Sequence, residues 1–268
     1  MFRLPAVPPT DDQQPIRGAA SFAKFVRVLQ FVADAPGRVS ITDIAQATGI
    51  PRPSAHRIVS ALLQEGMLAE QAGMRGLSLG SRLISLAYRS WDELELRRVA
   101  RPYLEKLNQQ LDETVHLAIN AGSEMVYVDK LESRRAVRMT SRLGTRVSLH
   151  ASAVGKAWLA AQPEDRQDEL TAGLSLLPFT PHTITDHQKF AAEIALTRAR
   201  SYALDLQESE LDICCYGQAI AGAGHVFGCV SLSLPRYRFD ELDPTTALTA
   251  IRDCVSGVAQ QMIRQLGL

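Results

Sequence analysis

Polar side chains that can bind nucleic acid recur at helical spacing in the N-terminal part of the chain. If residues 53–64 form a helix with about 100° between neighbours, one side is apolar and the other polar. The start of such a helix is the part that usually reaches base edges. Hydroxyl, imidazole and guanidinium groups can donate hydrogen bonds to phosphates and to guanine or adenine. A solvated helix face has the same pattern, but we predict a DNA-contacting face formed by Arg52, Ser54, His56, Arg57 and Ser60.

A second set of polar side chains, near the C-terminus, could bind a small anion. Ser231 and Ser233 alternate with Leu232, so both hydroxyls point to the same face of a strand. Ser152 precedes a run that is typical of a helix, and the free amides at a helix start favour a carboxylate. Each residue also has a plain structural explanation, since Ser152 could be only a helix cap and the strand serines ordinary cross-strand neighbours.

Catalysis and cofactor binding are disfavoured by the surroundings of the reactive residues. Cys215 could pair with His150 or His225 as nucleophile and base, but no catalytic signature surrounds them. The glycines of residues 222–224 fail the dinucleotide fingerprint because no helix follows them, and a hairpin turn explains them better. We therefore expect no enzymatic activity, no cofactor and no metal. The candidate metal ligands, which lack any recognised spacing, are Cys214, Cys215, His182 and His225.

The elements that hold the first polar set follow from periodicity and turn signals. An apolar stripe over residues 22–32 predicts a helix that stops at Pro36, and Ser40 precedes a second, short helix. After the third helix, two strand-like pieces at 67–70 and 76–79 complete a winged helix-turn-helix plan. Residues 81–100 contain no Gly or Pro and predict one continuous amphipathic helix whose apolar side needs a partner.

Strands and helices interleave in the rest of the chain. Strand-like runs at 115–119 and 125–129 precede helices near 152–161 and 189–200, and a final helix covers about 245–266. The fold class is therefore predicted to be α+β, with an interleaved α/β domain at the C-terminus. The predicted parts are a disordered tail (1–18), a winged helix-turn-helix domain (19–80), a linker and dimerisation helix (81–100) and a C-terminal domain (101–268).

The composition is that of an ordinary globular protein. The chain has 268 residues, of which 46% are hydrophobic and 22% charged, with 29 basic and 29 acidic residues. The length suits about two domains, and no apolar stretch approaches the roughly 18 residues of a membrane span. The start lacks the apolar segment of a signal peptide, and four cysteines fit no disulfide framework. We therefore expect a cytoplasmic protein that makes no contact with membranes.

From about Ser21 onward the chain resembles the IclR family of bacterial transcriptional regulators. Many stretches match in family order, which makes the resemblance specific although no single one is decisive. They are SITDIAQATGIP and SAHRI (40–58), RVARPYLEKL (98–107), ETVHLA (113–118), VYVDKLES (126–133), LHASAVGKA (149–157), TITD (183–186) and SLS (231–233).

The resemblance implies a regulator that combines operator binding with ligand sensing. A winged helix-turn-helix would bind near-palindromic operator DNA, the linker helix would dimerise, and a GAF-like C-terminal domain would bind an effector. The expected assembly is a homodimer or a dimer of dimers, and the expected role is repression of a neighbouring catabolic operon. The expected effector is a small organic acid. The alternative is a small-molecule sensor or interaction module that binds no operator.

The family's effector pocket can be carried over position by position. It implies contacts from the start of the helix after His150, from the Asp205 segment, from one cysteine and from the strand serines. Family members often have two more acids and an Arg in the Asp205–Cys215 segment, so the polarity of the pocket rim differs here. The wing carries Arg75 alone as a cation, which we also assign to DNA contact. The implied effector residues are Ser152, Ala153, Val154, Asp205, Cys215, Ser231 and Ser233.

Overall fold

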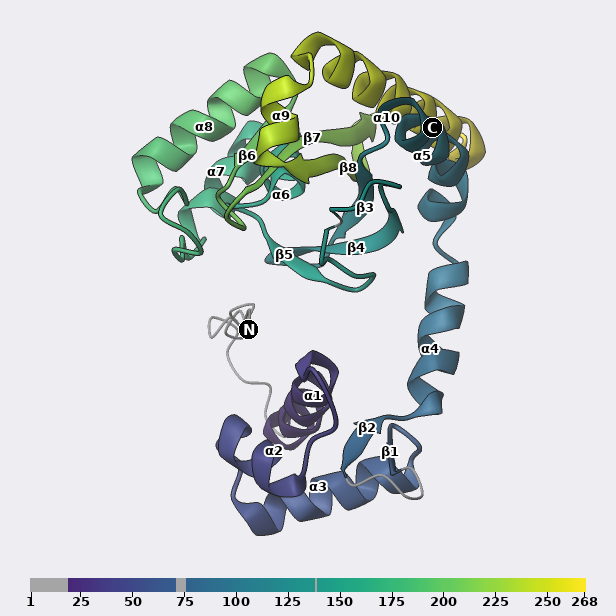
Figure 1. Ribbon diagram of the computed structural model, residues 1–268, viewed down its shortest axis with the longest axis vertical. Coiled ribbons are helices and arrows are strands. Elements are labelled where there is room, and N and C mark those ends of the chain that lie inside the picture. The colour runs from purple at the N-terminus through teal and green to yellow at the C-terminus, as the bar shows by residue number, and fades with distance from the viewer. Residues whose placement is uncertain (1–18, 71–75, 138) are drawn as a thin grey trace. The chain divides into compact units, whose positions relative to one another are not determined.

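The computed structural model describes residues 19–70, 76–137 and 139–268 (Figure 1). These residues form two compact units that divide between Glu93 and Leu94. The tail predicted for residues 1–18 lies outside the described residues.

The N-terminal unit contains helices around a small apolar core, followed by a hairpin and one further helix. The core side chains come from three helices and the hairpin, and they include Val28, Ile44, Ile58 and Leu68. The hairpin is antiparallel, and an isolated bridge joins Val39 to it. The elements are α1 (Ala19–Asp34), α2 (Ile41–Thr48), α3 (Arg52–Gln64), β1 (Leu68–Glu70), β2 (Leu77–Leu79) and α4 (Ser81–Asp92).

Local features of the chain define both ends of α2. The Ser40 hydroxyl accepts from the Asp43 amide at 3.2 Å, and the Asp43 carboxylate accepts from the Ser40 amide at 2.8 Å. This capping box satisfies two amides that a helix start otherwise leaves unpaired, and it lowers the pKa of Asp43. Gly49 ends α2 at φ 68°, a left-handed conformation that costs glycine nothing. The predicted helix-turn-helix is present.

The helix predicted over residues 81–100 is in fact two helices. α4 ends at Asp92, and α5 (Glu95–Leu111) begins after Leu94 and continues through Pro102, beyond the predicted end at residue 100. Helix α4 buries none of its residues, whereas α5 buries six against the C-terminal unit. Tertiary burial of the α5 apolar face therefore outweighs the local cost of an internal proline.

The C-terminal unit is built on one antiparallel sheet of six strands in the order β5-β4-β3-β8-β7-β6. Two strands and two helices of this unit, namely β5, β6, α7 and α9, were not predicted from the sequence. The strands are β3 (Thr114–Asn120), β4 (Glu124–Leu131), β5 (Arg146–Ser148), β6 (Ala203–Leu206), β7 (Ile213–Gly222) and β8 (His225–Pro235). The other helices are α6 (Ala153–Ala160), α7 (Glu164–Ala172), α8 (His187–Arg200), α9 (Arg236–Glu241) and α10 (Pro244–Leu266).

Helices cover both faces of this sheet. Helices α5 and α10 lie side by side over one face (Figure 1), and they share a core with Val230, Leu232 and Leu234 of β8. Helix α6 contacts the other face across β6, β7 and β8, and α8 packs against α6. The fold is therefore α+β, as predicted. None of the described helices is long and apolar enough to cross a bilayer.

Candidate functional site

Helix α3 separates an apolar face from a polar one as its periodicity predicted. The apolar face is buried in the N-terminal unit and consists of Ala55, Ile58, Val59 and Leu62. On the other side Arg52, His56, Arg57 and Ser60 are exposed and Ser54 is half-buried.

Within the part of the chain that the structure describes, the cations of this face have no acidic partner. Among the described residues neither Arg52 nor Arg57 forms an ion pair, and the Arg57 guanidinium donates only to the Ser54 hydroxyl, at 3.4 Å. The Ser60 hydroxyl lies 3.4 Å from Nδ1 of His56. An unpaired guanidinium on an exposed helix is available to a phosphate. Arg75, the predicted wing cation, lies outside the described residues.

The sheet register brings the implied effector residues into two adjacent rows. In one row Ser233 pairs with Cys215, and Cys215 pairs with Asp205 on β6. In the other row Ser231 pairs with Gly217 on one side and His116 on the other. Leu232 faces the opposite core, so the two serines share a face as predicted.

The N-terminus of α6 stands directly on this face. Gly217 allows the contact, because a Cβ there would lie only 2.5 Å from the Ala153 carbonyl oxygen. The Ser152 hydroxyl caps α6 by accepting from the Gly155 amide at 3.1 Å, and it donates to the Ser148 carbonyl at 2.6 Å. In the described chain the amides of Ala153 and Val154 make no hydrogen bond.

Asp205 is buried but engaged in the turn that follows β6. Its carboxylate accepts from the amides of Glu208 at 2.7 Å and Ser209 at 3.3 Å, and from the Ser209 hydroxyl. Ser209 also donates to the Ala151 carbonyl at 3.0 Å, which ties this turn to the start of α6. Burial raises the pKa of Asp205, while the Ser209 hydroxyl and the Lys156 charge oppose the rise. In this structure Asp205 and Ser152 organise the wall of the site with their own hydrogen bonds.

Three residues that were not predicted from the sequence, His116, Tyr127 and Ser141, complete the polar cluster. His116 is 2% exposed, and its ring stacks on Tyr127 with the centroids 4.2 Å apart. Its Nδ1 lies 3.3 Å from the Ser233 hydroxyl and its Nε2 lies 2.7 Å from the Ser141 hydroxyl. The available signal was the position of His116 between Val115 and Leu117, a polar side chain facing away from an apolar one.

One hydroxyl in the cluster is left without a partner. Ser231 Oγ is buried and makes no hydrogen bond within the described residues, whereas Ser233 Oγ accepts from the Cys215 thiol at 3.2 Å. Burial first, and then the acidic groups Cys215 and Asp205, raise the pKa of the Tyr127 phenol. Ser231 is near enough to Tyr127 to offset part of that rise, although it forms no bond of standard geometry.

The reactive groups of the alternative chemistries lie in unfavourable places. Burial raises the pKa of the Cys215 thiol well above its usual value, so the thiol is protonated. His225 lies at the far end of the β7–β8 hairpin, and His150 is held by Ser148 and the Leu177 carbonyl. Across the described ranges, no three His, Cys, Asp or Glu side chains group closely enough to hold a metal.

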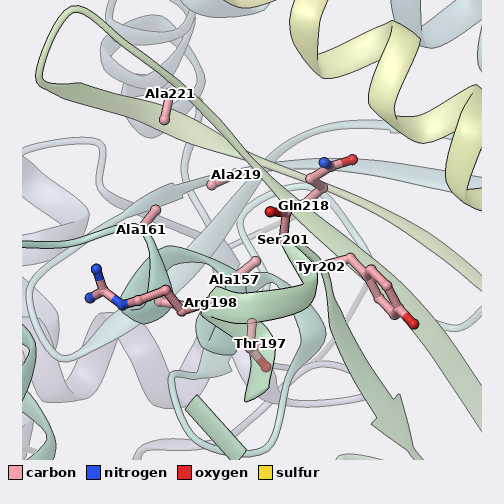
Figure 2. Close-up of a pocket in the computed structure, with 10 residues that line it drawn as sticks. Ala157, Ala161, Thr197, Arg198, Ser201, Tyr202, Gln218, Ala219 and Ala221 are labelled. Atoms are coloured by element: carbon pink, nitrogen blue, oxygen red, sulfur yellow. The ribbon is translucent and has the colours of Figure 1, made fainter. Parts of the chain in front are cut away.

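A separate surface cavity of about 240 Å³ lies at the other end of α6. Its floor consists of small residues such as Ala157 and Ala219, and its rim includes Arg198 and Tyr202. Figure 2 shows the Arg198 and Tyr202 side chains extending in opposite directions, so they do not converge on one ligand. The Arg198 guanidinium also donates to the Gln162 carbonyl and the Gln167 side chain. Polar groups converge instead at the N-terminus of α6, and we place the candidate site there.

A helix-turn-helix unit joined to a separate α/β unit with a buried polar cluster is the plan of a ligand-responsive transcriptional regulator. A model of the IclR helix-turn-helix domain matches residues 21–72, and the model "Bacterial transcriptional regulator IclR C-terminal" matches residues 88–260. The chain therefore belongs to the IclR family of bacterial transcriptional regulators, as the resemblance implied.

Individual relatives agree with this assignment. HTH-type transcriptional regulator Rv1719 of Mycobacterium tuberculosis is 32% identical over 224 residues, which cover 84% of each chain. HTH-type transcriptional regulator XynR of Escherichia coli is 27% identical, and the match covers 92% of this chain and 97% of XynR. An IclR homologue of Microbacterium hydrocarbonoxydans, solved in complex with 4-hydroxybenzoate, is 27% identical with a TM-score of 0.74. That match covers 90% of this chain and 98% of the homologue.

Proposed function

We propose that the protein represses a neighbouring catabolic operon, and that a small carboxylic acid bound in its C-terminal unit controls operator affinity. The observation that carries the proposal is the set of unpaired polar groups on one face of the sheet. The amides of Ala153 and Val154 and the buried Ser231 hydroxyl all lack partners among the described residues. Leaving a buried polar group unpaired costs about 1–3 kcal/mol, so a site that collects several is better explained by a ligand than by packing. The complex of a homologue with 4-hydroxybenzoate, itself a carboxylate, supports this chemistry.

The DNA-binding part of the proposal depends on α3. Its exposed Arg52 and Arg57 have no acidic partner among the described residues, and Ser54 and His56 lie beside them. A dimer would place two such helices in successive major grooves, about 34 Å apart. The operator is then a near-palindrome whose half-sites repeat at one helical turn of DNA.

The dimer is proposed to form through α4. Helix α4 buries nothing, and Leu83, Ile84, Ala87 and Tyr88 form an apolar stripe along it, with Ile84 72% exposed. Another apolar side chain of the N-terminal unit, Phe22 on α1, is also exposed, at 70%. A second copy of the chain is the occupant that this stripe fits, because the same stripe on the partner is self-complementary. Ile84→Asp is expected to yield monomers in sedimentation analysis while the circular dichroism spectrum is retained.

The mechanism is a shift of population between two arrangements of the dimer. The acid binds the C-terminal unit better in one arrangement, and α4, which joins the two units in sequence, changes the spacing of the DNA-binding heads. The factor by which the acid changes operator affinity can then be no larger than the ratio of the two arrangements' affinities for the acid.

The test is fluorescence anisotropy with the intergenic DNA upstream of the protein's own gene and a scrambled duplex at two salt concentrations. Tight binding to the native fragment alone, weakening steeply with salt, is the expected result. Adding small carboxylic acids to the complex should then release the DNA. Equal, weak binding to both duplexes would favour a sensor that binds no operator, and tighter binding with acid would contradict release as the response.

A further inference from the structure

His116 lies within the proposed effector site, and both of its ring nitrogens are within hydrogen-bond distance of a side-chain hydroxyl. It lies on β3 directly opposite Ser231, whose hydroxyl has no partner among the described residues. Tyr127 stacks on one face of the imidazole, which fixes the orientation of the ring. Both ring nitrogens therefore point along the sheet face that carries the polar cluster, one toward Ser233 and the other toward Ser141.

The imidazole is neutral in this environment. Burial, with a smaller contribution from the Lys130 charge, lowers the pKa of His116 to about 3. A neutral imidazole carries one hydrogen-bond donor and one acceptor, so it can bind an O–H or a carbonyl by choice of tautomer. It adds no charge to the site, and the anion-binding role remains with the amides at the start of α6.

The hydroxyl that meets Nε2 comes from outside the sheet. Ser141 belongs to the connection between β4 and β5, and its Oγ lies 2.7 Å from Nε2 of His116. Lys130 holds this connection in place by donating to the carbonyls of Met139 at 2.9 Å and Ser141 at 2.7 Å. Thr140 and Arg142, on either side of Ser141, are exposed. Ser141 therefore reaches inward from a surface segment to satisfy a buried ring nitrogen.

We propose that His116 binds a hydroxyl or carbonyl oxygen of the effector, and that Ser141 occupies that position in the ligand-free protein. This inference rests on the proposed effector site and specifies its ligand further. Gly217, under the start of α6, is two strands away from His116, with Ser231 between them. Strands are about 4.8 Å apart, so the backbones at the two ends are about 10 Å apart. A single small molecule with a carboxylate at one end and an oxygen function at the other spans the side-chain space between them.

The physical consequence is selectivity within pairs of acids that differ by one hydroxyl. A hydroxy acid exchanges its own hydrogen bond for that of Ser141. An acid without the hydroxyl has two options. Either Ser141 stays in place and the acid has less room, or Ser141 is displaced and Nε2 of His116 is left buried without a hydrogen bond. A site built to bind such a group rejects the analogue that lacks it. The effector is therefore a carboxylic acid with a second oxygen function rather than a simple fatty or aromatic acid.

The experiment is isothermal titration calorimetry of the full-length protein with matched acids. The couples are benzoate and 4-hydroxybenzoate, and phenylacetate and 4-hydroxyphenylacetate, in which the hydroxyl lies at the end of the molecule opposite the carboxylate. In at least one couple the hydroxy acid should bind about tenfold more tightly than its partner, the effect of one hydrogen bond to a buried group. In His116→Phe the two members of that couple should bind equally.

Ser141→Ala supplies a test that does not risk the fold, because Ser141 lies on a surface segment. Without the competing hydroxyl the hydroxy acid should bind about 2- to 12-fold more tightly than to the wild type, while its deoxy partner changes little. Thr140→Ala, an exposed neighbour with no side-chain hydrogen bond in the described structure, is the matched control and should behave as wild type.

Three results would overturn the inference. If both members of every couple that binds do so with equal affinity, the carboxylate site stands, but His116 does not bind a second oxygen of the effector. If Ser141→Ala and Thr140→Ala bind the hydroxy acid with equal affinity, Ser141 has no role in effector binding. Binding of none of the four acids would refute both this inference and the carboxylate site, while the anisotropy assay would still report operator binding separately.

Discussion

Replacement of the buried Lys156 by methionine should strongly destabilise the C-terminal unit. Lys156 is 0% exposed, and its ammonium lies 2.5 Å from one carboxylate oxygen of Glu208 and 3.8 Å from Glu193. Glu193 keeps a second partner, Arg200, at 2.7 Å. Glu208 has no other cation among the described residues, and its Oε2 already lacks a hydrogen bond. The variant therefore leaves one uncompensated buried carboxylate.

The size of the effect follows from that single charge. Removing one partner of a buried ion pair costs about 3–5 kcal/mol. Burial raises the pKa of Glu208 from 4.5 to about 7 even with Lys156 beside it, so without Lys156 its pKa should rise further. Protonating a carboxyl above its ordinary pKa costs about 1.4 kcal/mol per pH unit, which amounts to about 5 kcal/mol at pH 8 but less than about 1 kcal/mol at pH 5. The wild-type carboxyl, with its pKa of about 7, already bears about 3.5 kcal/mol of this cost at pH 8. Lys156→Met should therefore lose about 3–5 kcal/mol relative to the wild type at pH 8, and a loss about 1.4 kcal/mol smaller at pH 5.

The sign of this pH dependence follows from the raised pKa. A carboxyl whose pKa is higher in the folded than in the unfolded state binds protons better when folded. Its stabilising effect is complete below the unfolded pKa and is lost as the pH rises through the folded value. The window for this loss in the variant extends from about pH 4.5 upward through the raised pKa of Glu208.

The assay is urea unfolding followed by circular dichroism at pH 5 and pH 8, supported by thermal melts. For a unit of this size 3–5 kcal/mol corresponds to a fall in Tm of roughly 6–20 °C. Lys189→Met, at an exposed lysine of α8 with no ion pair in the described structure, is the control and should change stability by less than about 0.5 kcal/mol. The double variant Lys156→Met, Glu208→Leu should recover most of the loss. A deficit below about 1 kcal/mol at pH 8, or an equal deficit at both pH values, would refute the reasoning.

Three further predictions concern DNA binding and the effector site. Arg57→Ala should weaken operator binding and reduce the slope of log affinity against log salt by about 1, with the fold unchanged by circular dichroism; an unchanged slope would exclude α3 from the DNA backbone. Gly217→Ala places a methyl group 2.5 Å from the Ala153 carbonyl oxygen, so it should lower stability by about 1–3 kcal/mol and abolish release of operator by acid in the anisotropy assay. Ser231→Ala combined with Ser233→Ala should blunt that release while operator affinity without acid stays at the wild-type value. A double variant that still responds like the wild type would place the effector elsewhere.

Local patterns in the sequence were sufficient for most elements of the N-terminal unit. The Ser40 capping box and Gly49 act within a few residues of the chain, and the apolar face of α3 follows from a period of 3.6 residues. The division at Leu94 was not predictable in the same way. A continuous amphipathic pattern crosses it, and only α5 finds a core to pack against.

The candidate site also combines features that follow from the sequence with features that depend on tertiary structure. That Ser231 and Ser233 share a face follows from strand alternation, which is a property of the sequence alone. The order of strands in the sheet decided their partners. It places His116 beside Ser231, 115 positions away, and Cys215 beside Ser233, 18 positions away. The hydroxyl of Ser152 and the carboxylate of Asp205 are used within the wall of the site, and that use depends on the turn at Glu208 and Ser209.

The sequence by itself determined the family, the fold class, the polar face of α3 and the shared face of the strand serines. Tertiary structure decided which polar groups meet and which remain unpaired. Lys156 shows why: its sequence neighbours are apolar, yet it is buried against Glu208, which lies 52 residues further along the chain. Hydrogen bonds and ion pairs act over a few ångströms in space, and only the folded sheet with its helices brings such distant residues within that range.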